Sequence, residues 1–463
     1  MSENKKIEFY GGSFGPWIPV LFMIAGMLVG TRIGGGGILR FSLVTFLALA
    51  IGFLLCKDKK SFGKISLGGL SNTMLGVIIA AFLLAGILSQ LLRQSGLVSS
   101  LVWVASLMHL NVAFIPLICF VTCMLISTSC GTSSGSVTAV APIMIPVAAA
   151  MQCDVGLVCG AIISGAIFGD NLAPISDTTI GSALTQEAEI KDVVRTRLPY
   201  SLIAAAISIV LFVVFGFMTT TGTGAEEIAA DGSHKLSLLL LLIPILMIIM
   251  MAKGWDLVST LIVCDICGII LNLVLRTIPV YSEVAEDGTV TVAGMFANEG
   301  PIVAGLSGMM SLLLYIILLF QILEILNVSG AFDKLMNSLM KTVKTERSGE
   351  LICMLGTAIC TACAGGSSPA VMFFGPMVRR VTKQFKIHRT RGANILDATA
   401  CGISGLLPYG TGPILCLTFA NAAGITDIDF TDIIPYCFHC MFLLLIFLGS
   451  IITGIGRRKE EVE

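Results

Sequence analysis

The chain alternates between long apolar runs and two regions in which apolar residues are mixed with Gly, Ser, Thr and Pro. A helix needs roughly 17 or more apolar residues to cross a bilayer. Runs of that length lie at residues 16–33, 38–56, 66–92, 199–218, 236–252, 255–276, 301–327 and 432–455, and the mixed regions cover 97–190 and 331–424. Polar groups at membrane depth are tolerated only where protein or a wet cavity surrounds them. The pattern therefore predicts membrane-spanning helices around two functional regions.

The composition excludes a soluble protein. Of the 463 residues, 56% are hydrophobic and 12% are charged, and the mean hydropathy is +0.95, whereas soluble proteins carry roughly 25% charged residues. The net charge of −1 offers no basic surface for nucleic acid. The CxxC pairs lie in or beside apolar runs, which favours packing over metal or redox chemistry. We therefore expect no nucleic-acid partner, no cofactor and no enzymatic activity.

Short motifs recur at a nearly constant separation along the chain. Ser95-Gly96 returns as Ser329-Gly330, and Pro174 returns as Pro408, each 234 residues later. Thr128-Ser129-Cys130 returns as Thr361-Ala362-Cys363, with a Gly/Ser-rich stretch after both copies. A constant separation that lands on the same unusual features indicates an internal duplication.

The basic residues predict how the two halves cross the membrane. Twenty-three of the 28 basic residues fall into clusters at residues 5–6, 57–64, 191–197, 253, 334–347, 379–391 and 457–459. If these clusters face the cytoplasm, the span at 66–92 runs outward and its repeat partner at 301–327 runs inward. The halves are then inverted, both termini are cytoplasmic, and residues 219–235 form an external linker.

These patterns predict an all-α polytopic membrane protein with about ten transmembrane helices. The first repeat covers 1–218 and contains framework spans in 16–92, a transport region at 97–190 and a closing span at 199–218. The second covers 236–463, with framework spans in 236–327, a transport region at 331–424 and a closing span at 432–455. Each transport region is expected to hold one re-entrant hairpin, at 110–150 or 349–378, followed by a discontinuous helix. Inverted repeats around broken helices are typical of secondary transporters.

The first candidate site is the polar stretch from Gly169 to Thr179, which follows an almost wholly apolar segment. Pro174 removes a backbone donor and disfavours helix at Ala173, so we expect a helix break with free carbonyl oxygens. Carboxylate, amide, hydroxyl and backbone oxygens can replace the water shell of Na⁺, and an Asp in the same cavity lets a proton compete with it. The alternative is a surface loop in which Ser176 or Asp177 caps a helix. The proposed cation and proton ligands are Asp170, Asn171, Ser176, Asp177, Thr178 and Asp397, with Na⁺ at Asp170, Asn171, Asp177 and Thr178.

The second candidate site is the pair of Gly/Ser-rich hairpins together with the second helix break. Glycines permit tight turns, and hydroxyls at the following helix ends can face an ion or a carboxylate, although such stretches also serve close helix packing. The expected cavity residues are Thr132, Ser133, Ser134, Gly365, Gly366, Ser367, Ser368, Pro408, Tyr409 and Thr411.

Five acids lie at membrane depth: Asp170, Asp177, Asp265, Glu324 and Asp397. The predicted spans place no Lys or Arg within their cores, so each acid is expected to take up a proton or bind a cation. For Asp265 and Glu324, on framework helices, a protonated structural role is an equal alternative. The basic clusters, including 379–391, are interpreted as topology determinants at the lipid headgroups.

The stretch Phe168-Gly169-Asp170-Asn171-Leu172-Ala173-Pro174-Ile175-Ser176-Asp177-Thr178-Thr179 resembles the most recognisable segment of the NhaC family of Na⁺/H⁺ antiporters, in the wider ion-transporter superfamily. The hairpins and the segment from Asp397 to Thr411 support the resemblance. Family proteins commonly have Ser where this chain has Ala173, which could remove one hydroxyl from the site.

The resemblance implies an inner-membrane exchanger of cytoplasmic Na⁺ for external H⁺. It also implies an elevator-like movement of the hairpins and broken helices against a framework, often in a homodimer. The same family includes exchangers that couple Na⁺ and H⁺ to malate and lactate, and members associated with amino acids. A carboxylate or amino-acid exchanger therefore remains the alternative, and a buried Arg in the cavity would favour it.

Overall fold

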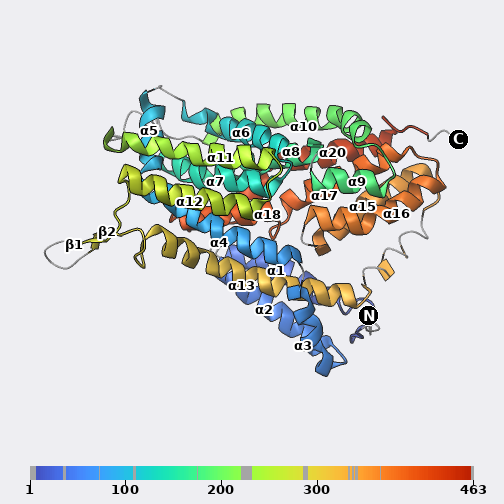
Figure 1. The fold of residues 1–463 in the computed structure, drawn as a ribbon. Coiled ribbons are helices and arrows are strands. Elements are labelled where there is room, and N and C mark those ends of the chain that lie inside the picture. Colours follow the sequence, from blue (N-terminus) through green and yellow to red (C-terminus); the bar gives the residue numbers. More distant parts are fainter. Residues whose placement is uncertain are drawn as a thin grey trace.

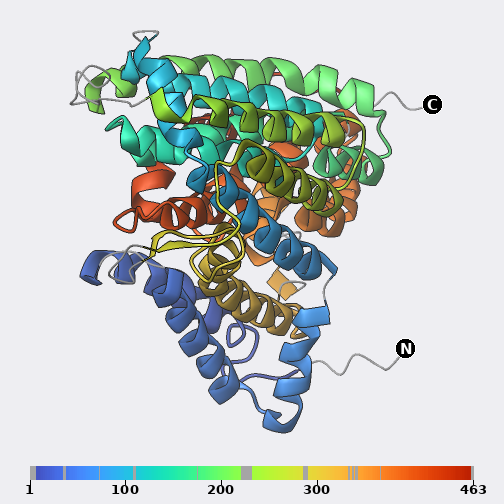
Figure 2. The same ribbon diagram turned by 60° about the vertical axis from the view of Figure 1, so that its left-hand side comes forward.

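The computed structural model is a helical bundle with one short two-stranded sheet (Figures 1 and 2). It describes residues 7–459 except 35–37, 72, 108–110, 175, 220–231, 285–289, 332–333, 336–337, 339–342 and 365. Within these residues, eight helices are long and apolar enough to cross a membrane, or nine if the bent pair Phe430–Tyr436 and Phe438–Thr453 is one span. The all-helical membrane fold is thus confirmed, while the count of ten and the re-entrant hairpins stay predictions.

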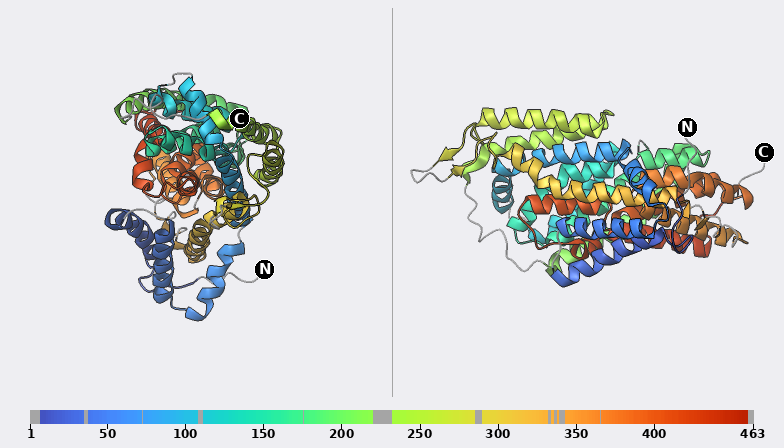
Figure 3. Two further views of the ribbon diagram at one scale, coloured as in Figure 1. Left: turned by 90° about the vertical axis from the view of Figure 1, so that its left-hand side faces the viewer. Right: turned by 90° about the horizontal axis from the view of Figure 1, so that it is seen from below.

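One group of helices surrounds the long helix α13. These elements are α1 (Trp17–Gly34), α2 (Ile38–Leu55), α3 (Lys59–Gly68), η1 (Gly69–Ser71), α4 (Thr73–Gln94), α12 (Leu257–Leu275) and α13 (Pro301–Val328). Helix α13 packs against α2, α3 and α4, and α12 packs against α4. Figures 1 and 3 show α2 and α3 on the side of α13 that faces away from the rest of the bundle. We call this group the framework.

The helices outside the framework form a second group, and the first half of this group runs from α5 to α10. It contains α5 (Leu97–Leu107), η2 (Val112–Phe114), α6 (Ile115–Cys130), α7 (Ser133–Ala150), α8 (Val155–Leu172), α9 (Asp177–Thr185) and α10 (Ile190–Thr219). Next come η3 (Gly232–Leu241), α11 (Leu242–Ala252) and, between α12 and α13, the sheet of β1 (Glu283–Val284) and β2 (Val290–Val292). This sheet, which the sequence did not predict, lies at one end of the bundle, with α9 and α16 at the other (Figure 1).

The second half repeats the boundaries of the first. It contains α15 (Glu346–Ala364), α16 (Ser367–Gln384), α17 (Arg389–Leu406), α18 (Thr411–Ala422), α19 (Phe430–Ile433), η4 (Ile434–Tyr436) and α20 (Phe438–Thr453). Helices α7 and α8 begin and end 234 residues before α16 and α17, and α9 begins 234 residues before α18. The repeat found in short motifs therefore extends to whole helices.

Both predicted helix breaks are present. Helix α8 ends at Leu172 and α9 begins at Asp177, with Pro174 between them; α17 ends at Leu406 and α18 begins at Thr411, with Pro408 between them. Proline lacks an amide donor and restricts the residue before it, which explains both breaks.

Small residues bring α6 close to α8 beside the first break. A Cβ on Gly165 would lie 2.3 Å from the Phe120 carbonyl oxygen, and one on Gly169 would lie 2.3 Å from the Thr128 amide nitrogen. Gly131 ends α6 in the left-handed conformation, with φ of +69°. This close packing places the turn between α6 and α7 beside the end of α8.

Candidate functional site

Asp170 lies in the last turn of α8 and is held by two hydroxyls. Ser133, the first residue of α7, donates to one carboxylate oxygen at 2.8 Å, and Ser176 donates to the other at 2.6 Å. The side chain is 5% exposed. In the part of the chain that the structure describes, Asp170 forms no ion pair with Lys, Arg or His. It is a buried carboxylate that needs a proton or a cation to neutralise it.

Ser176 has two roles that the sequence offered as alternatives. Its hydroxyl caps α9 by accepting from the Thr178 amide at 3.3 Å, and it also contacts the Thr178 hydroxyl at 3.0 Å. The same oxygen reaches Asp170. Ser176 therefore caps α9 and also donates to Asp170. It is fully buried, so the motif is not a surface loop.

A small cavity lies where the two helical hairpins, α6–α7 and α15–α16, meet the two helix breaks. Its volume is about 30 Å³, and it is lined by Ser133, Val137, Ile163, Ala166, Ile167, Gly366, Ser367, Ser404, Gly405, Thr411 and Gly412. This volume suits a water molecule or a single small ion. The structure thus brings Ser133, Gly366, Ser367 and Thr411 together, and Ser133 also donates to the Asp170 carboxylate. Their role as substrate-cavity residues stays a prediction.

Asp397 is neutralised by a buried arginine, contrary to the sequence-based expectation. The Arg197 guanidinium of α10 forms an ion pair with Asp397 of α17, and both side chains are 0% exposed. The same guanidinium donates to the Asn171 carbonyl and, at 3.1 Å, to the Asn394 amide oxygen. The helix begins at Ile190, nine residues before the predicted span, so Arg197 lies inside it. The expectation of spans without a basic residue was wrong.

A spacing signal in α10 could have located this arginine. Val193, Arg197 and Ser201 follow one another at intervals of four, and all three are buried. Residues four apart lie on one face of a helix. An Arg on a face of small residues indicates burial against a partner more than exposure at a headgroup.

Asn171 lies beside Arg197 and α10. Its amide oxygen accepts from Ser201 of α10 at 2.8 Å, and its amide nitrogen is buried with no hydrogen-bond partner among the described residues. Thr178 contacts Ser176 and, at 3.6 Å, the Cys401 thiol. Asn171 and Thr178 therefore link the first break to α10 and α17.

Asp177 lies apart from the Asp170 hydroxyls. Its side chain is exposed and lines a separate open cavity with Ser368 and Pro369 of the second hairpin. A role for Asp177 in Na⁺ binding stays a prediction, with the residue near the site rather than inside it.

The remaining predicted residues occupy the tips and breaks. Thr132 precedes α7 and contacts Ser134 through their hydroxyls at 3.1 Å. The Tyr409 hydroxyl donates to the Ala362 carbonyl at 2.9 Å, which joins the second break to α15, and Pro408 lies within that break. Gly365 lies outside the described residues.

Two of the basic residues in 379–391 are buried. Arg391 pairs with Glu350 at 2.9 Å with side-chain exposures of 3% and 1%, and Arg379 pairs with Glu187 at 3.0 Å. These ion pairs join α17 to α15 and α16 to the α9–α10 connection. Arg379 and Arg391 therefore have a structural role that the sequence analysis missed, and the placement of this cluster at the lipid headgroups stays a prediction. Pairing between residues far apart in sequence leaves no local pattern.

Asp265 and Glu324 differ in their surroundings. Asp265 is 6% exposed within α12, and both its oxygens lack a hydrogen-bond partner among the described residues. Glu324 of α13 lines a larger cavity between the framework and the second hairpin.

The comparison with known families agrees with this architecture. A family model described as "Na+/H+ antiporter family" matches residues 10–217 and 236–454. The chain belongs to this family. The resemblance to NhaC proteins is thereby confirmed, and the relatives are transporters rather than enzymes.

Three curated relatives show the range of the family. The Na⁺/H⁺ antiporter NhaC of Alkalihalophilus pseudofirmus is 23% identical over 84% of this chain and 82% of its own. The arginine/ornithine antiporter ArcD of Halobacterium salinarum is 23% identical over 80% and 78%. The malate-2H⁺/Na⁺-lactate antiporter of Bacillus subtilis is 31% identical over 37% and 36%. Family membership therefore identifies a multi-pass membrane antiporter and leaves its cargo open.

Proposed function

We propose that this protein exchanges cytoplasmic Na⁺ for external H⁺, with Asp170 as the group that binds either ion. The observation that carries the proposal is the buried Asp170 carboxylate with two hydroxyl contacts and no basic partner among the described residues. Na⁺ bound there displaces the proton, and a proton displaces Na⁺, since a buried carboxylate favours one neutralising partner at a time. One group thus couples the two fluxes.

The pairing of Arg197 with Asp397 supports one central site rather than two. Asp397 already has a cation, so Asp170 is the acid of the helix breaks whose charge changes during exchange. We retain Ser176 and Thr178 as neighbouring ligands and Asp177 as an acid near the entrance.

Alternating access would move the hairpins and broken helices against the framework, in an elevator-like manner. The separation of the molecule into helices around α13 and helices around the two breaks supports this movement. We further propose a bacterial inner-membrane location with both termini cytoplasmic, from the basic clusters, and a homodimer, from the family resemblance.

A malate- or lactate-type exchanger, like one relative, has less support from the geometry. A carboxylate substrate needs a free cation, yet the buried Arg197 is bound to Asp397. The residues lining the central cavity include no Lys, Arg or His. An amino-acid exchanger, as in another relative, remains compatible with an acidic site.

The test is proton movement in proteoliposomes with an internal pH dye and an imposed Na⁺ gradient. Asp170→Asn is expected to abolish Na⁺-dependent proton movement, because a neutral amide cannot exchange a proton for Na⁺. Asp177→Asn is expected to raise the Na⁺ concentration needed for half-maximal rate. Asp427→Asn, at an exposed loop position, is the matched control and should behave as wild type. Full activity of Asp170→Asn, or a requirement for an organic solute, would overturn the proposal.

A further inference from the structure

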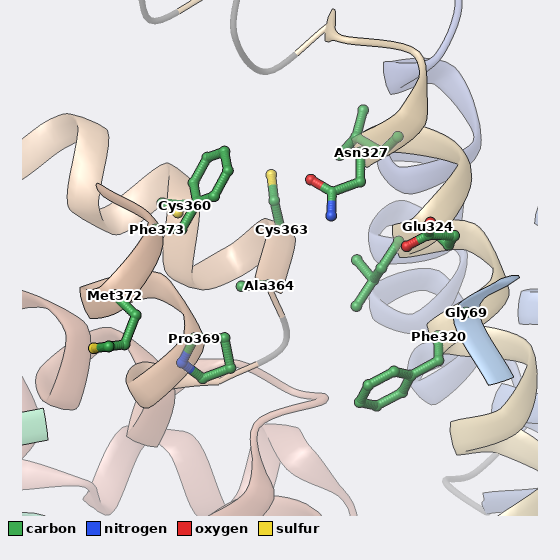
Figure 4. A pocket seen from close by; sticks show the side chains of 12 residues that line it. Gly69, Phe320, Glu324, Asn327, Cys360, Cys363, Ala364, Pro369, Met372 and Phe373 are labelled. Atoms are coloured by element: carbon green, nitrogen blue, oxygen red, sulfur yellow. The ribbon is translucent and has the colours of Figure 1, made fainter. Parts of the chain in front are cut away.

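A second and much larger cavity separates the framework from the second hairpin. Its volume is about 410 Å³. Figure 4 shows Glu324 and Asn327 of α13 on one side, with Cys363 of α15 and Phe373 of α16 on the other. It shares no lining residue with the central cavity beside Asp170. A site here is distinct from the ion site proposed above.

Glu324 is the one charged side chain among the residues that line this cavity. Its carboxylate forms no hydrogen bond or ion pair within the described residues. The Asn327 side chain is exposed and offers a second oxygen. The backbone of η1 lies close to α13 here. A Cβ on Gly69 would lie 2.4 Å from the Phe320 carbonyl oxygen and 3.1 Å from the Glu324 Cβ. Helix α13 is thus packed against η1 at Glu324, and the Glu324 side chain lines the cavity.

The other side chains that line the cavity are apolar or carry a thiol. They include Phe320, Leu323, Met372 and Phe373. A hydrated Na⁺ ion gains nothing from such walls, whereas an alkyl chain is stabilised by burial against them. A positively charged group is also attracted to the faces of aromatic rings. The volume, more than ten times that of the central cavity, accommodates an organic molecule.

We propose that this cavity binds a small organic amine with one positive charge and a short apolar chain. The ammonium group pairs with Glu324 and donates to the Asn327 amide oxygen. The alkyl chain of the amine lies against Phe373 on the opposite side. A single carboxylate neutralises a single charge, so a diamine leaves its second charge against apolar walls at a desolvation cost. The site goes beyond the proposed ion exchange and depends on different residues.

The experiment is isothermal titration calorimetry of the full chain in detergent, with n-butylammonium as the probe. We expect n-butylammonium to bind, and butyrate and 1,4-diaminobutane to bind at least about tenfold more weakly. Glu324→Gln keeps the shape and removes the charge, and should weaken n-butylammonium binding by at least about tenfold. Glu299→Gln, the same change at an exposed position just before α13, is the matched control and should bind as wild type.

Equal binding of n-butylammonium to Glu324→Gln and wild type would overturn the inference, as would stronger binding of butyrate. Binding of Na⁺ without any binding of n-butylammonium would also overturn it and indicate an ion vestibule. Binding is measured without an ion gradient, and Asp170→Asn should bind the amine as wild type does. Failure here is therefore distinguishable from failure of the proposed Na⁺/H⁺ exchange.

Discussion

At the scale of single residues, the two buried acids Asp170 and Asp397 differ in how their charge is compensated. Asp397 is paired with Arg197, and its second oxygen accepts from the Cys401 thiol at 3.1 Å. Asp170 has hydroxyl donors only, from Ser133 and Ser176. Two buried carboxylates in corresponding helices thus have different chemistry because of their neighbours.

The Arg197–Asp397 pair predicts a strong and specific loss of stability. Arg197→Met leaves a buried carboxylate without its cation, which costs about 3–5 kcal/mol. We expect a lower midpoint of thermal unfolding in detergent, measured by intrinsic fluorescence. The double variant Arg197→Met/Asp397→Leu should recover most of the loss, because no unpaired charge remains.

Arg195→Met is the matched control for this prediction. Arg195 is exposed and lies two residues away on the same helix, so its removal should leave the free energy of unfolding within about 0.5 kcal/mol of wild type. If Arg197→Met were as stable as Arg195→Met, the pair would not hold α10 to α17 in the membrane-embedded protein.

At the scale of elements, the positions of helices were predictable and their charged contacts were not. The apolar run at 301–327 matches α13, and Pro174 marks the break between α8 and α9, because both signals are local in sequence. Arg197 and Asp397 are 200 residues apart, so no local pattern identifies the pair. The same limit applies to Arg391 and Glu350.

Glu187 lies outside the candidate membrane spans and provides a pH-dependent connection between elements. It lies between α9 and α10, and its carboxylate accepts from Lys383 of α16 at 2.8 Å and from Arg379 at 3.0 Å. These hydrogen bonds lower the pKa of Glu187 from 4.5 to about 2. The connection ties the first broken helix to the second hairpin.

The lowered pKa predicts where this connection is lost. A carboxylate whose pKa is lower in the folded state stabilises the fold above its unfolded pKa, and the effect disappears as pH falls through the folded pKa. Stability from Glu187 should therefore be complete above about pH 4.5 and decline toward pH 2. Glu187→Gln should reduce the slope of unfolding midpoint against pH in this window. An unchanged slope would show that the contact does not form in solution, and Glu189→Gln on the same connection is the control.

At the scale of the whole molecule, only one of the two cavities lies on the boundary between the two groups of helices. The central cavity lies within the group of hairpins and broken helices, whereas the larger cavity lies between that group and the framework. In the exchange that we propose, an ion bound at Asp170 would travel with the hairpins and breaks as one unit. Movement of that unit must change the larger cavity, because α13 and α15 form its opposite sides (Figure 4).

This arrangement predicts that a bridge across the larger cavity stops exchange. Asn327→Cys places a thiol on α13 facing Cys363 of α15, and the cavity of about 410 Å³ between them calls for a short bismaleimide rather than a disulfide. Cross-linking, verified by mass spectrometry, should abolish Na⁺-dependent proton movement in proteoliposomes if the hairpin slides against the framework. The same reagent on Asn327→Cys/Cys363→Ser attaches at one end only and should leave exchange largely intact. Full exchange by the cross-linked protein would mean that α13 and α15 keep their separation during transport, which would exclude an elevator movement at this boundary.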